Sequence, residues 1–179
     1  MPGFTTAMPT SFKVEILKAV HNFSNPGGNT FKIALGKAAA SISGTYGAAT
    51  TSYTNLTSNS DELASGSGYT TGGNTLTSVT PVADGTTAVC DFSDTTWSSA
   101  TFTTSGAIIY NDTATGDPAC AVLSFGGDQS VSSGDFTIQF PAAAAACRRR
   151  RRCAEIRIRR EKSTVARGRC ARTRACRGS

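Results

Sequence analysis

Residues 134–141 read Gly-Asp-Phe-Thr-Ile-Gln-Phe-Pro, and this stretch decides the fold class. Its large apolar residues, Phe136, Ile138 and Phe140, alternate with polar ones, which is the period of a strand with one buried face. The same alternation occurs near the N-terminus in Phe31–Leu35. Both segments are therefore predicted to be half-buried strands.

Further strand-like segments lie between these two and are separated by polar turns. They cover residues 76–82, 88–92, 99–110 and 119–125. Gly106 interrupts the longest segment and predicts a β-bulge there. Six or so short strands with polar turns predict an all-β domain, either a β-sandwich or a jelly-roll-like fold.

Large apolar side chains on these segments are expected to form the core. They are Phe31, Ile33, Leu35, Phe92, Trp97, Ile109, Leu123, Phe136, Ile138 and Phe140.

One short helix is expected over residues 10–22. It would begin at a Pro-Thr-Ser sequence, and Phe12, Ile16 and Val20 would form one apolar stripe, joined by Leu17.

Residues 36–73 are dominated by Ser, Thr, Gly, Ala and Asn, without a clear strand or helix period. This composition predicts a long surface segment with one short strand, of the kind that often carries function. Tyr46, Tyr53 and Tyr69 are isolated within it. We expect these three tyrosines to be exposed and to be candidate surface contacts.

Charge divides the chain into two parts. Residues 1–146 contain four lysines, no arginine and ten acidic residues, so their net charge is −6. Residues 147–179 contain thirteen arginines, one lysine and two acidic residues, so their net charge is +12. The sequence therefore predicts a β-rich domain over 1–146 and an Arg/Cys-rich tail over 147–179, and only the tail is expected to attract anions.

Consecutive arginines open the tail and are candidate contacts for an anion or an acidic surface. They are Arg148, Arg149, Arg150, Arg151 and Arg152. Such a run can bind phosphates, or it can lie on an acidic protein face. A third interpretation is a neutral extension read in a shifted frame of a GC-rich gene, since Arg, Ala, Cys and Gly codons are GC-rich. Later in the tail, Ile156 and Ile158 alternate with arginines, which predicts one last strand that can pair with the domain.

The spacing of the cysteines does not match that of a structural zinc site. Cys90 and Cys120 lie in predicted strands, and the others, Cys147, Cys153, Cys170 and Cys176, lie in the tail. The spacing within the tail pairs is C-x5-C, which differs from the C-x2-C spacing of structural zinc sites. We expect reduced thiols, no metal site and no cofactor; the alternatives are zinc binding by the tail cysteines and disulfides formed after release from a cell.

The residues that could catalyse a reaction are few. His21 is the only histidine, and we expect it to be structural. Asp91 with Asp94, and Asp112 with Asp117, could act as paired carboxylates, but Asp is also a favoured turn residue and both pairs lie between strands. No nucleophile, base and orienting group come together in the sequence, so we predict that the chain is not an enzyme.

The N-terminus has no basic segment followed by a long apolar one, and no run of about 18 apolar residues occurs anywhere. We therefore expect synthesis in a host cytoplasm, without a signal peptide or contact with a membrane.

A set of segments between residues 11 and 141 occurs in the same order in a known group of proteins. The segments are Ser11–Leu17, His21–Phe23, Thr30–Leu35, Gly68–Gly73, Asp91–Trp97, Gly106–Asn111, Phe125–Asp128 and Gly134–Pro141. Together they resemble small virion structural proteins encoded by tailed bacteriophages. Such proteins end soon after the Phe-Pro segment with a short strand that resembles Ile156–Ile158, which here follows the arginine run.

The resemblance implies a virion component without catalytic residues. The first hypothesis is a capsid decoration (cement) protein, whose partners would be copies of itself and other virion proteins, above all the major capsid protein. Residues 36–73 and the first dozen residues would then bind the capsid. The alternatives are a tail or fibre component that contacts the host surface through the three tyrosines, and a capsid shell protein whose tail binds the genome. Nucleic acid would be bound through the tail only.

Overall fold

The computed structural model describes residues 3–140 and 157–161. Its strands and helices are, in chain order, β1 (Gly3–Phe4), α1 (Thr10–Leu17), β2 (Phe31–Leu35), the 3-10 turn η1 (Ala39–Ser41), β3 (Thr45–Tyr46), α2 (Thr54–Ser58), β4 (Asn74–Leu76), β5 (Ser78–Asp84), β6 (Thr87–Phe92), β7 (Thr95–Asn111), β8 (Ala119–Gln139) and β9 (Arg157–Glu161). The prediction of an all-β domain with a short N-terminal helix is confirmed.

Five strands form the main sheet, in the order β4-β2-β7-β8-β9, and each neighbouring pair is antiparallel. The remaining strands form two small pairs, β1 with β3 and β5 with β6. The finer expectation of a β-sandwich or a jelly-roll-like fold stays a prediction.

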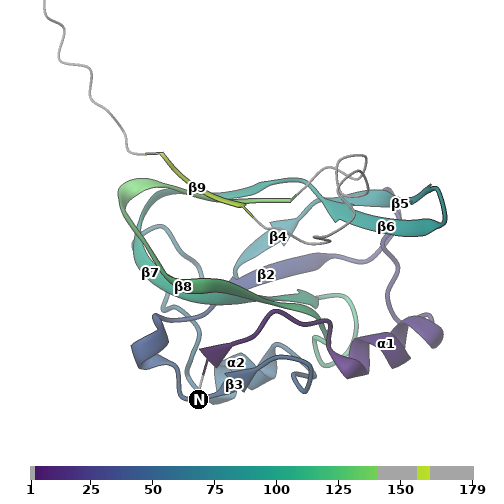
Figure 1. The fold of residues 1–179 in the computed structure, drawn as a ribbon, viewed down its shortest axis with the longest axis horizontal. Helices are drawn as coiled ribbons and strands as arrows, with labels where there is room; N and C mark the ends of the chain where they lie inside the picture. The colour runs from purple at the N-terminus through teal and green to yellow at the C-terminus, as the bar shows by residue number, and fades with distance from the viewer. Residues whose placement is uncertain (1–2, 141–156, 162–179) are drawn as a thin grey trace, which may run out of the picture.

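The β7–β8 hairpin is long enough to curl over the rest of the sheet (Figure 1). Its inner half pairs with β2, so that Ile33, Ile109 and Ala121 lie side by side. Its outer half carries Trp97 and Phe136, and these side chains belong to the same buried cluster as Ile33 and Ile109. The curled hairpin thus encloses the larger core between its own two halves.

A second, smaller core lies on the other face of the sheet. Residues that alternate with those of the first core, such as Ala34, Ile108 and Val122, point into it. Residues 42–56 cover this face and contribute Leu56, which is fully buried, whereas Tyr69, from the same polar segment 36–73, belongs to the larger core. Both faces are therefore covered at β2, at residues 107–110 of β7 and at residues 119–123 of β8, and these stretches are apolar on both faces.

Eight of the ten predicted core residues are buried, and the other two, Phe92 and Phe140, are half-buried at the edge of the larger core. The predicted bulge lies opposite Gly106 and not at it: between Thr104 and Gly106 the register shifts because the extra residues are on β8, at residues 125–128. A side chain at Gly106 would collide with the Phe4 ring and the Leu123 carbonyl oxygen, so only glycine fits there.

Several predicted boundaries are wrong. The segment 76–82 is divided at Thr77 between β4 and β5, which belong to different sheets. The segments 119–125 and 136–140 are parts of one strand, because Gly126 and Gly127 adopt positive φ and bulge out of β8 without ending it.

The predicted helix is real but ends early. α1 stops at Leu17, where Lys18 closes the last turn and Ala19 takes a left-handed conformation with φ 57°. Of the expected apolar stripe only Phe12 is buried, while Ile16 and Leu17 are 47% and 88% exposed. Phe12 and Glu15 face the body and contact His21, whereas Ile16 and Leu17 lie on a side of α1 that no other described segment covers.

The last strand was predicted correctly. β9 pairs antiparallel with the end of β8, so that Gln139 lies opposite Arg157 and Asp135 lies opposite Glu161. A segment of the Arg-rich region therefore completes the edge of the main sheet.

Candidate functional site

The three tyrosines of residues 36–73 do not form a surface patch, and that prediction is wrong. Tyr46 and Tyr69 are 1% and 3% exposed, and Tyr53 is half-buried with its ring stacked on Tyr110. Their hydroxyl groups point inward to two carboxylates, Asp61 and Glu62. The tyrosines are anchors that hold the polar segment on the sheet.

Glu62 accepts hydrogen bonds from two of these tyrosines. The Tyr69 hydroxyl donates to Oε1 at 2.7 Å and the Tyr53 hydroxyl donates to Oε2 at 2.6 Å. The backbone N–H of Gly72 also donates to Oε1, at 2.6 Å. Three donors thus replace water around a carboxylate that is only 8% exposed.

Asp61 has a similar environment. It accepts from the Tyr46 hydroxyl at 2.6 Å and from the backbone N–H groups of Ser43 and Gly44. Burial alone would raise the pKa of Asp61, but these hydrogen bonds outweigh it and hold the pKa below its ordinary value. Burial and the hydrogen bond to Asp61 both raise the pKa of Tyr46, so the phenol stays protonated.

Sequence reasoning missed these carboxylates, although a signal was present. Asp61 and Glu62 are the only acidic residues in 36–73 and they are adjacent. Two carboxylates in an otherwise almost uncharged segment with isolated tyrosines indicate a buried hydrogen-bond network more than a solvated loop.

A second polar cluster is centred on His21, beneath α1. His21 Nε2 lies 2.9 Å from Glu15 Oε2, and Nδ1 lies 3.1 Å from Asn111 Nδ2 and 3.7 Å from Cys120 Sγ. Backbone N–H groups of Thr113 and residue 114 donate to Asn111 Oδ1, which turns the Asn111 amide N–H toward the histidine. Nδ1 is therefore the acceptor, and Nε2 carries the proton that it donates to Glu15.

The order Cys120–His21–Glu15 is the order of a thiol nucleophile, a base and an orienting carboxylate, which sequence spacing could not reveal. The surroundings oppose that chemistry. Cys120 is 5% exposed, and burial, aided by the negative charge of Glu15, raises the pKa of its thiol far above the ordinary value. The histidine side chain is fully buried. These contacts fit the structural role predicted for His21.

The aspartates singled out from the sequence make local contacts, and only Asp117 adjoins a cluster, since its carbonyl oxygen accepts from the Tyr53 N–H at 2.9 Å. Asp91 Oδ1 accepts from the backbone N–H of Phe92, and Asp94 Oδ1 accepts from that of Phe140. Asp112 forms an ion pair with Lys32 at 3.0 Å. Within residues 3–140, no group of three or more His, Cys, Asp or Glu side chains is placed to hold a metal ion.

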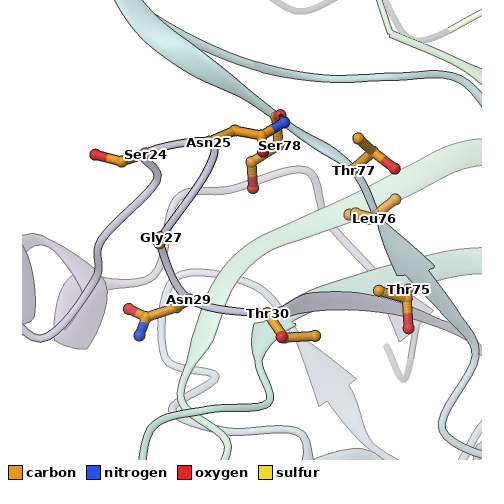
Figure 2. Close-up of a pocket in the computed structure, with 10 residues that line it drawn as sticks. Ser24, Asn25, Gly27, Asn29, Thr30, Thr75, Leu76, Thr77 and Ser78 are labelled. Atoms are coloured by element: carbon orange, nitrogen blue, oxygen red, sulfur yellow. Dashed lines mark hydrogen bonds between the residues drawn. The ribbon is translucent and has the colours of Figure 1, made fainter.

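One open pocket of about 170 Å³ lies between the turn at residues 24–30 and the β4–β5 junction (Figure 2). Ser24, Asn25 and Asn29 line one side, and Thr75 and Ser78 line the other. Asn25 Nδ2 donates to the Ser78 carbonyl oxygen at 2.7 Å and ties the two sides together. No titratable side chain lines the pocket, so it offers hydrogen bonds but no acid–base group.

The arginine run Arg148–Arg152 and the four tail cysteines lie outside the described residues. In the described part of the chain, Cys90 and Cys120 form no disulfide. None of the helices found there is long and apolar enough to cross a membrane. Compared with protein-family models, curated proteins and solved structures, the chain matched none.

Proposed function

We propose that the chain is a non-enzymatic structural component of a tailed-phage virion, and specifically a capsid decoration protein on the outer face of the shell. Its partners would be further copies of the chain and the major capsid protein.

The observation that carries this proposal is where the phage-like segments lie in the fold. Thr30–Leu35 contains β2, Gly106–Asn111 is the inner half of β7, and Gly134–Pro141 includes the end of β8. These segments form the centre of the main sheet and supply much of its core. The resemblance thus concerns the folded body as a whole, which supports a shared architecture.

The hydrogen bonds of the buried titratable side chains also support a structural role. Asp61 and Glu62 are saturated with donors, and His21 holds α1 to the sheet through Glu15 and Asn111. These groups hold the fold together, and none of them lines the pocket between residues 24–30 and the β4–β5 junction.

The same geometry weakens the tail-fibre alternative, in which Tyr46, Tyr53 and Tyr69 would contact a host surface. Two of these side chains are buried and all three hydroxyl groups are engaged with carboxylates. The first residues are also built into the body, because β1 pairs with β3 and Ala7 bridges to Val122. Capsid contacts would therefore come from the outer surface of these segments.

Particles purified from the bacteriophage that encodes the chain provide the test. We expect quantitative mass spectrometry to find the chain in many copies per particle, and electron microscopy to place it outside the shell. Its presence in infected-cell lysate but absence from particles would contradict the proposal, and density inside the shell would favour the genome-binding alternative.

The arginine run is tested in the same particles by replacing Arg148–Arg152 with serines, which leaves β9 in the chain. We propose that the run is a neutral extension, so particle incorporation should be unchanged at low and at high salt. Loss of incorporation would mean that the run binds a partner. A duplex-DNA affinity that falls with salt at a log–log slope of about −0.9 per phosphate would identify that partner as nucleic acid.

A further inference from the structure

The exposed large apolar side chains of the described residues gather in two places. Met8, Val14, Ile16 and Leu17 lie on or just before α1, and Val79 and Val82 lie on β5. Scattered single apolar residues need no explanation, but two groups on short elements at the surface are typical of an interaction site.

Few of the described residues cover the β5–β6 hairpin. Five successive residues of β5, Val79–Ala83, are exposed, so both faces of that strand are open over this length. To the rest of residues 3–140, the hairpin is attached at its base, through Phe92 in the larger core and through Asn25, which bonds to Ser78 and Thr80. A two-stranded hairpin in water is marginally stable by itself, so contact with a partner would stabilise this one.

The pairing register places the apolar residues of the hairpin together. Val82 lies opposite Val89, and Val79 lies opposite Asp91, because a bulge separates the two valines on β5. Asp84 lies opposite Thr87, on the same face as Val82. The hairpin therefore has one face that points away from the Phe92 side chain, and we call this face the hairpin surface. It carries Val79, Val82, Asp84, Val89 and Asp91.

The outer side of α1 also combines exposed apolar side chains with charged ones, but its charges are positive. Phe12 and Glu15 face the body, where they contact His21. The remaining arc carries Lys13, Val14, Ile16, Leu17 and Lys18, and we call it the α1 surface.

The charges of these surfaces are uncompensated within the described residues. Lys32 is paired with Asp112 and Lys37 Nζ bonds to the Ser60 carbonyl oxygen, whereas Lys13 and Lys18 make no such contact there. Asp84 on the hairpin surface makes no ion pair in that part of the chain either. Each surface thus offers apolar side chains flanked by charges that the other can neutralise.

We propose that the chain pairs with a second copy of itself, the α1 surface of each copy lying against the hairpin surface of the other. α1 and the hairpin lie toward the same end of the molecule, at the right in Figure 1. A two-fold axis at that end makes both contacts at once, and such closed pairs are the commonest protein oligomers. The pairing does not depend on the virion assignment, since it is measured in solution without particles.

Sedimentation equilibrium of the full chain is the first test. We expect the average mass to rise toward that of a dimer with concentration, and Leu17→Asp to raise the dimer dissociation constant at least about tenfold, because it buries a charge against apolar side chains. Leu17 is 88% exposed, so the fold tolerates the change. Ser132→Asp adds the same charge at an exposed position of β8 and should leave the constant unchanged.

Charge exchange identifies the partner surface. Lys13→Glu with Lys18→Glu, or Asp84→Lys with Asp91→Lys, should each weaken pairing about three- to tenfold, and an equal mixture of the two variants should pair about as well as the original chain. Circular dichroism checks that each variant is folded. A chain that stays monomeric up to about 0.1 mM overturns the proposal. So does self-association, through the tail or otherwise, that none of these substitutions changes.

Discussion

The polar segment 36–73 and the β5–β6 hairpin both lie outside the central strands, yet they are held in opposite ways. The polar segment has few large apolar residues, but Tyr46, Leu56 and Tyr69 are buried and two carboxylates tie it down. The hairpin has the regular strands and the valines, but most of its residues are exposed. A segment is therefore held on the sheet by a few buried side chains and their hydrogen bonds. The number of its apolar residues alone does not predict whether it is held.

The largest effect should come from removing an anchor. We expect Glu62→Ala to lower the free energy of unfolding by about 3–5 kcal/mol, because the Tyr53 and Tyr69 hydroxyls and the Gly72 N–H lose their acceptor in a buried place. Urea unfolding followed by circular dichroism measures it. Phe136→Ala, in the larger core, sets the scale at about 3–5 kcal/mol. A loss below about 1 kcal/mol for Glu62→Ala would remove the distinction between the two regions.

A smaller effect concerns pH. The pKa of Asp61 is lower in the folded state than in the unfolded chain, so its contribution to stability is complete above the unfolded pKa, about 3.9, and is lost as the pH falls through the folded value. We expect the free energy of unfolding to fall less between pH 5 and pH 3, roughly the range concerned, in Asp61→Asn than in the original chain. Equal slopes in the two proteins would show that the hydrogen bonds from Tyr46, Ser43 and Gly44 do not favour the charged form.

The smallest effect is expected in the hairpin. Val79→Thr and Val82→Thr should change the free energy of unfolding by no more than about 0.5 kcal/mol when measured at concentrations at which the chain is monomeric, since both side chains are already exposed. The same substitutions should matter more at concentrations that favour pairing, because a bound partner stabilises the folded state by mass action. A loss in the monomer as large as that of Glu62→Ala would mean that the hairpin is an anchored part of the body.

The sequence by itself determined where most strands lie and which of their faces are apolar. The alternation at residues 31–35 and 136–140 correctly placed β2, the end of β8 and most of the core. The alternation at residues 156–159 marked β9, whereas the bulge expected at Gly106 lies on the opposite strand, at Gly126 and Gly127 of β8. These features are local, since side-chain alternation follows from the geometry of the extended backbone.

Only the tertiary structure decided which neighbours each apolar or polar side chain contacts. Tyr46 and Tyr69 were expected outside and are inside, because Asp61 and Glu62 supply acceptors beneath them. Ile16 and Leu17 were expected to be covered, and they are exposed because α1 packs on the body through Phe12 and Glu15 and no other described segment covers the rest of the helix. Burial depends on which distant segment folds over a residue, and hydrophobic periodicity holds no information about that segment.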